Sequence, residues 1–156
     1  MAILTRVAHL RRRRTSVGSE RGAELIEFAI VLPVLLLIVM GIVDFGFMFQ
    51  RYVVLTNAAM EGARVAVLPG YGDADITSRV RAYATDGGVP GTVTVTPGNV
   101  TVPGPGGTTW PARQVTVTYD YGFNYLGPIA SLFGGGSRTV TLTARSTMRN
   151  QVSTSP

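Results

Sequence analysis

The chain has 156 residues, no cysteine, one histidine (His9) and a formal net charge of +5. Without cysteine there is no disulfide framework, and the residue pattern predicts neither a metal cluster nor a catalytic triad. The positive charge does not predict nucleic-acid binding either. Six arginines and one acid in residues 1–22 account for all of it, and residues 23–156 carry eight arginines and eight acids. We therefore expect no enzymatic activity, no cofactor, no metal and no nucleic-acid partner.

A basic leader opens the chain. Arg6, Arg11–Arg14 and Arg21 all precede a membrane-length apolar segment. Such an arginine excess keeps its side of a membrane in the cytoplasm and also attracts anionic lipid. The apolar stretch is too long for the h-region of a cleaved secretory signal, and no small-residue cleavage site follows it promptly. Residues 1–22 therefore form a predicted topogenic leader, with a plain uncleaved signal anchor as the main alternative.

The next segment is an apolar run from Phe28 to Phe49 that contains one charged residue, Asp44. As a helix it would be roughly 33 Å long, which suffices to cross a hydrocarbon core of about 30 Å. We therefore predict a single crossing of the lipid bilayer. The N-terminus would lie in the cytoplasm, and everything after Gln50 would lie outside it.

Two residues interrupt this run. Pro33 removes one helical donor and frees the carbonyl of Ala29, which indicates a local kink or loosening. It is either a flexible point that helps the segment leave the bilayer or a tolerated membrane proline. Asp44 lies near the outer end. It either snorkels toward the interface, meets a polar partner, or is an interfacial acid without a role.

Helix-forming residues continue beyond the run, and Pro69 with Gly70 should end the helix. A rod over residues 23–67 would be roughly 68 Å long. Its alanine-rich second half should pack against the rest of the chain. Glu61 and Arg64, spaced i and i+3, should pair weakly.

The remaining chain predicts a small extracytoplasmic domain over residues 68–149 and a flexible tail over 150–156. Asp75 is expected to cap a helix over 76–85. Three stretches alternate apolar with polar residues and predict antiparallel strands: around Val93 and Val95, over 115–121, and over 140–145. Loops are expected at 97–111, with a short strand near Val100 and Val102, and at 122–136. The predicted fold class is α+β, with a three- to four-stranded antiparallel sheet packed on the long helix.

Two short blocks carry a family resemblance. Gly22 is followed by four residues, then Glu27 and Phe28, and this spacing resembles the cleavage motif of type IVb prepilins. The wider block 21–33, together with Asn57-Ala-Ala-Met-Glu-Gly-Ala-Arg64, resembles the TadE-like proteins. These are minor pilins or pseudopilins of the tight-adherence (Tad) pilus system.

The resemblance implies that a prepilin peptidase cuts between Gly22 and Ala23 at the cytoplasmic face. Glu27 would then be the fifth residue of the mature protein and would pair with the N-terminal amine of a neighbouring subunit. The alternative for Glu27 is an acid in the first helical turn, where the helix dipole favours it. Implied partners are the peptidase, other Tad pilins and the inner-membrane assembly platform, with incorporation into an extracellular pilus.

Two other classes remain open. One is an uncleaved single-pass anchor that displays a small binding domain, which cleavage at Gly22 distinguishes from a pilin. The other is a cell-envelope enzyme that uses Ser, Asp and Tyr residues of the loops. It would need a concave cluster of acids with shifted pKa values, which no pattern in the sequence indicates.

Overall fold

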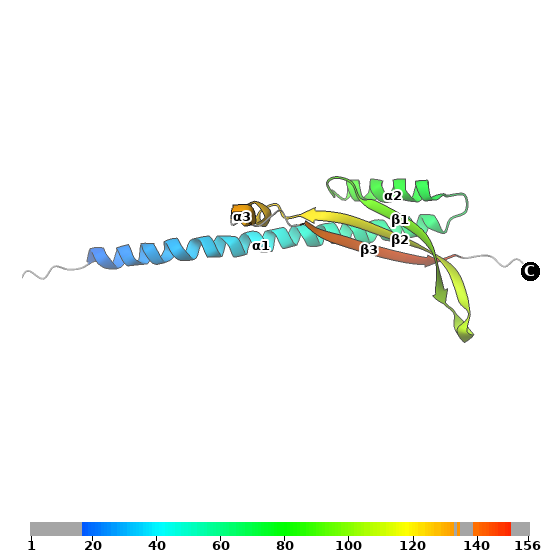
Figure 1. Cartoon of the computed structure of the whole chain (residues 1–156), viewed down its shortest axis with the longest axis horizontal. Helices are drawn as coiled ribbons and strands as arrows, with labels where there is room; N and C mark the ends of the chain where they lie inside the picture. The colour runs from blue at the N-terminus through cyan, green and yellow to red at the C-terminus, as the bar shows by residue number, and fades with distance from the viewer. Residues whose placement is uncertain (1–16, 133, 135–138, 151–156) are drawn as a thin grey trace, which may run out of the picture. The chain divides into compact units, whose positions relative to one another are not determined.

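The computed structural model describes residues 17–132, 134 and 139–150, so most of the predicted leader and tail, including Arg6 and Arg11–Arg14, lie outside the described residues. Within these residues, three helices, three strands and one short 3₁₀ turn follow one another (Figure 1). In order they are α1 (Val17–Ala66), α2 (Asp73–Asp86), β1 (Thr94–Pro103), η1 (Pro105–Gly107), β2 (Thr109–Gly122), α3 (Leu126–Leu132) and β3 (Thr139–Arg149).

The chain divides into two compact units, residues 1–39 and 40–156. The described part of the first unit is helical throughout and belongs to α1. Over Gly22–Ala66, α1 is long and apolar enough to cross a membrane, judged by length and composition. The predicted helix over 23–67 is confirmed, although it begins earlier, at Val17. It ends at Ala66, where the Leu68 amide donates to the Val65 carbonyl at 3.0 Å and closes a turn.

The second unit contains the C-terminal part of α1, helices α2 and α3, and an antiparallel sheet of strand order β1-β2-β3. The register pairs Thr94 with Thr118 and Val117 with Ala144. Inward-facing apolar residues of the sheet share one core with α1 and α2; they are Val115, Val117, Tyr121, Leu142 and Ala144. The predicted α+β fold, with its sheet on the long helix, is therefore confirmed with three strands.

Close approach of helix and sheet depends on Gly62 of α1. A Cβ at this position would overlap Val80 of α2 and lie 3.2 Å from Val115 Cγ1 of β2. The alanines Ala58, Ala59 and Ala63 on the neighbouring turns are completely buried. Small side chains at these positions let the backbone of α1 approach α2 and the sheet.

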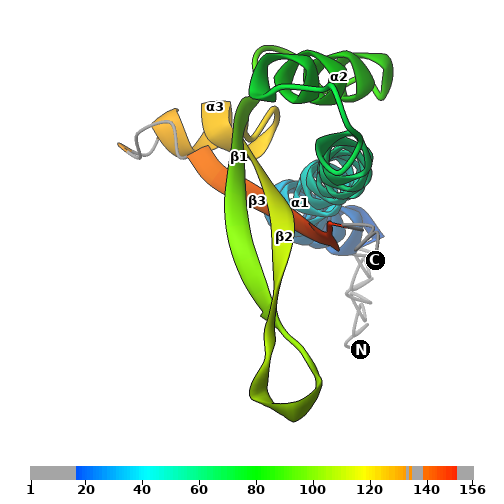
Figure 2. The same ribbon diagram turned by 90° about the vertical axis from the view of Figure 1, so that its right-hand side faces the viewer.

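The predicted loop over 97–111 is wrong for most of its length, whereas the short strand expected near Val100 and Val102 is confirmed as part of β1. Strand β1 continues to Pro103, β2 begins at Thr109, and the resulting hairpin extends past the core at the bottom of Figure 2. Pro97 is compatible with this because β1 is an edge strand, where a missing N–H need not break a ladder bond. The turn itself uses Gly106 and Gly107, both with positive φ, a conformation that glycine adopts without strain.

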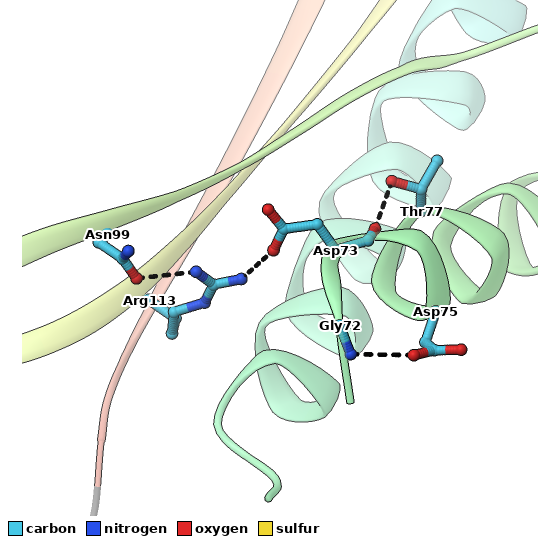
Figure 3. A network of polar contacts seen from close by, with 6 residues as sticks. All are labelled: Gly72, Asp73, Asp75, Thr77, Asn99 and Arg113. Carbon is cyan, nitrogen blue, oxygen red and sulfur yellow. Dashed lines mark hydrogen bonds and ion pairs between the residues drawn. The ribbon is translucent and has the colours of Figure 1, made fainter. Parts of the chain in front are cut away.

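Two further local predictions need correction. The predicted loop 122–136 contains helix α3. Helix α2 begins at Asp73 after an N-cap at Gly72, so Asp75 is not the cap but the third helical residue. Its carboxylate accepts the Gly72 N–H at 2.9 Å, because an acid at that position can reach back to an unpaired donor (Figure 3).

Polar contacts join α2 to the elements beside it. The Arg113 guanidinium of β2 donates to Asn99 Oδ1 at 2.7 Å and to Asp73 of α2 (Figure 3). Glu61 of α1 accepts from Arg79 Nη2 of α2 at 2.9 Å, whereas its predicted partner Arg64 lies at 4.0 Å. The expected i, i+3 pair therefore exists, but the closer contact of Glu61 joins two helices.

Candidate functional site

Gly22 and Ala23 lie inside α1, five residues after its first residue Val17. Nothing lies within 4 Å of a Cβ built on Gly22, and its φ is not positive. Glycine in a helix interior costs about 1 kcal/mol relative to alanine. The described structure therefore gives no steric or conformational reason for a glycine at this position. Cutting the Gly22–Ala23 bond would also require this part of α1 to unwind locally.

Glu27 and Phe28 occupy the next turn of the same helix, and both are exposed, Phe28 by 60%. Among the residues whose structure is described, no basic side chain lies within 4.0 Å of the Glu27 carboxylate. Ala23 lies one helical turn before Glu27, so a new amine at Ala23 would be close to this acid.

Pro33 is accommodated within α1, which continues through it without interruption. Its ring nitrogen carries no hydrogen, so the Ala29 carbonyl lacks its usual helical donor. Pro33 is also exposed, which leaves room beside this carbonyl for another donor. A flexible point at Pro33 stays a prediction.

The last predicted site residue, Asp44, is completely buried, with 0% of its surface exposed. Its carboxylate accepts three backbone amides from the segment before and at the start of α3. The Asn124 amide donates to Oδ1 at 3.1 Å, while the Tyr125 and Leu126 amides donate to Oδ2 at 3.0 and 2.8 Å. Asp44 thus satisfies amides at the start of a helix that lies far away in the sequence.

A cluster of aromatic residues surrounds this contact. The Tyr121 hydroxyl donates to the Asp44 backbone carbonyl at 3.1 Å. The Phe123 ring stands edge to face against Tyr121, at a centroid distance of 5.5 Å, and against Phe45, at 6.1 Å. Burial, followed by the nearby Asp44 charge, raises the pKa of the Tyr121 hydroxyl above its usual value. The phenol therefore stays a neutral donor to the helix.

Of the three alternatives for Asp44, a polar partner is the one that the structure shows. An acid without a role is wrong, because the carboxylate is buried and accepts three backbone amides. The depth of Asp44 relative to a membrane interface stays a prediction. Sequence reasoning missed residues 124–126 as the partner. Their side chains carry no signal for it, since the donors are backbone amides that every non-proline residue possesses.

Nothing in the described residues brings together three or more His, Cys, Asp or Glu side chains in an arrangement that could hold a metal ion. The predicted site residues are divided between the two compact units. Gly22, Ala23, Glu27, Phe28 and Pro33 belong to the first compact unit, whereas Asp44 belongs to the second. We therefore treat the N-terminal segment and the Asp44 contact as separate sites.

Comparison with known proteins finds a family match in the N-terminal part of the chain. Residues 22–64 match the family described as TadE-like protein, which confirms the resemblance seen in the two sequence blocks. The match begins at Gly22 and lies entirely within α1, so the sheet is outside it. No curated protein and no solved structure matches the chain. The family connects this chain with the Tad pilus.

Proposed function

We propose that this protein is a minor pilin, or pseudopilin, needed to assemble a Tad-type adhesive pilus, and that a prepilin peptidase removes residues 1–22. The observation that carries the proposal is Gly22. It begins both the family match and the part of α1 that is long and apolar enough to cross a membrane, yet the described structure needs no glycine there. Gly46 shares this lack of a packing partner, so Gly22 is distinguished by its place five residues before Glu27, at the start of the family match.

The mature protein would then consist of an assembly helix over residues 23–67, an extracytoplasmic α+β domain over 68–149 and a tail over 150–156. It would cross the cytoplasmic membrane once, with its N-terminus in the cytoplasm. Its partners would be the peptidase, other Tad pilins, the inner-membrane assembly platform and the lipid bilayer. The long exposed apolar surface of α1 is suited both to lipid and to the helices of other subunits.

Glu27 supplies the electrostatic part of the proposal. An ionised acid at the centre of a membrane helix costs about 2.5–3.5 kcal/mol on insertion scales, and less near the interface. Cleavage creates an amine at Ala23, which can offset this cost. In the monomer, the Glu27 carboxylate pairs with the Ala23 amine of its own chain. In the assembly, it pairs with the amine of a neighbouring subunit where subunit packing excludes water.

Processing is tested by N-terminal sequencing and intact mass of the membrane-extracted protein from cells that contain the peptidase. The mature chain should begin at Ala23, and Gly22→Val should retain the leader. Gly46→Ala is the matched control, because a Cβ there also meets nothing within 4 Å, and it should be processed normally. An intact Met1 terminus on the native protein would favour the uncleaved anchor instead.

Assembly is tested with Glu27→Gln, which keeps the size of the side chain and removes its charge. Cleavage and membrane insertion should continue, while co-purification with other pilins and the number of pili should fall. Glu24→Gln is the control, since Glu24 is exposed in the same region of α1. Normal piliation in the Glu27→Gln strain would mean that Glu27 is only a helix-start acid.

Topology is tested with a reporter fused after Gln151. It should be active only outside the cytoplasm, and replacing Arg11–Arg14 with neutral residues should produce some inverted molecules. Reporter activity in the cytoplasm of cells that express the unmodified chain would contradict the proposed arrangement.

A further inference from the structure

Helix α3 lies beside a part of α1 that belongs to the apolar run (Figure 1). A Cβ at Gly41 of α1 would lie 3.9 Å from Leu126 Cδ1, and the Asp44 carboxylate binds the amides at the start of α3. On these same turns of α1, large apolar side chains that α3 does not cover are exposed, including Ile42 by 67% and Phe45 by 49%. Helix α3 therefore shares its position along α1 with side chains suited to lipid.

The position of α3 along α1 can be compared with the next charge. Arg51 is the first charged residue after Asp44, and its guanidinium donates to the Gly88 carbonyl of the loop after α2. Gly41 and Asp44 precede Arg51 by ten and seven residues. At about 1.5 Å per residue, they lie roughly 10–15 Å closer to the N-terminal end of α1. Measured from Arg51, Asp44 lies at the upper end of the depth of about 5–10 Å at which interfacial helices lie, and Gly41 lies deeper.

The composition of the segment fits such a location. No charged residue occurs between Asp120 and Arg138. Tyr125, directly before α3, is 44% exposed, as is Tyr52 of α1. Tyrosine concentrates at membrane–water interfaces, because its ring is apolar and its hydroxyl is polar. A loop that faces only water would require neither the lack of charged residues nor an exposed tyrosine.

The hydrogen bonds of Asp44 remove the main physical obstacle. Irregular backbone near the hydrocarbon is tolerated only where its polar groups find partners within the protein. The amides of Asn124, Tyr125 and Leu126 find theirs in the Asp44 carboxylate, and the carboxylate is in turn satisfied without water. The buried acid of α1 and the amides at the start of α3 therefore satisfy each other's need for hydrogen-bond partners.

We infer that α3 and Tyr125 form a second membrane contact, which lies in the outer leaflet at the boundary between headgroups and acyl chains. Asp44 is the positioning residue that holds this element at its depth. The inference rests on the proposed topology, in which α1 crosses the bilayer and the sheet domain lies outside the cytoplasm. Its consequence is that the domain is bound to the membrane surface before it enters a fiber, so assembly has to release α3 as well as α1.

The absence of cysteine allows a direct test. Single cysteines at Ala130 and Ser131, both exposed on α3, are spin-labelled in the full-length chain. The protein is reconstituted in vesicles of phosphatidylethanolamine and phosphatidylglycerol. Accessibility of each label to oxygen, which partitions into lipid, is compared with accessibility to a water-soluble nickel chelate. A label at Ile42 is the lipid reference, and a label at Thr143, exposed on β3, is the aqueous reference.

Labels at Ala130 and Ser131 should be reached several-fold better by oxygen than by nickel, as at Ile42, and the Thr143 label should show the opposite preference. Nickel accessibility on α3 equal to that at Thr143 would overturn the inference. Shielding from both reagents would also overturn it, because α3 would then be covered by another protein chain. A water-accessible Ile42 label would instead refute the membrane crossing of α1, so the two failures are distinguishable.

Discussion

Replacing Asp44 by asparagine tests the contact between α1 and α3 directly. Two of the three donors, the amides of Tyr125 and Leu126, share Oδ2, whereas Asn124 uses Oδ1. The single carbonyl oxygen of an asparagine should keep accepting the Tyr125 and Leu126 amides, and the NH₂ group of its side chain should then face the Asn124 amide. One donor then loses its acceptor, at a cost of about 1–3 kcal/mol, and the other two bonds lose their charge assistance.

Hydrogen exchange of the backbone amides, followed by mass spectrometry on the full-length protein in detergent, measures this loss where it occurs. If the free energy of local opening falls by about 1–3 kcal/mol, amides in the peptide over 123–132 should exchange roughly 5- to 150-fold faster in Asp44→Asn. Amides of β2 around Val117 should change little, because Val117 is buried among the core residues and the three amides bound by the Asp44 carboxylate lie at residues 124–126.

Asp120→Asn is the control, since Asp120 is exposed and, among the described residues, accepts a single side-chain bond, from Thr141 at 2.6 Å. It should leave exchange over 123–132 unchanged. If Asp44→Asn leaves the exchange of that peptide as slow as the control does, the carboxylate does not hold α3, and the reasoning from the three amides is refuted.

Two further predictions concern the core. Gly62→Val should destabilise the domain by about 1–3 kcal/mol, because its side chain would overlap Val80. Thermal unfolding measures this, and an unchanged midpoint would show that α1 does not approach α2 as closely as described. The second concerns Tyr121, whose pKa is raised by burial and by Asp44. A raised folded-state pKa gives stability that is complete below the unfolded value near 10 and is lost as pH rises through the folded value. The free energy of unfolding, measured by chemical denaturation, should therefore fall more steeply above pH ~10 in the natural chain than in Tyr121→Phe. Parallel pH profiles of the two proteins would contradict this.

Some features of this protein follow from the sequence because they depend on local patterns. The apolar run identifies α1, because an apolar stretch of membrane length favours a helix, which satisfies its own backbone hydrogen bonds. Pro33 lies inside this run and does not end the helix. Alternation at Val115, Val117 and Tyr121 likewise identifies the buried face of β2, which the structure confirms. The two family blocks are also local, and the family match over residues 22–64 bears them out.

Other features were decided only by tertiary structure. Pro97 and the glycines after it are typical of a loop, but pairing with β2 keeps β1 extended to Pro103, because an edge strand tolerates a proline. Helix α3 is too short to be stable by propensity, and its start is held by an acid that precedes it by 82 residues. The sequence by itself placed an expensive carboxylate at residue 44. Only the fold supplied its partners, because backbone amides look alike in every sequence until the chain brings particular ones to the acid.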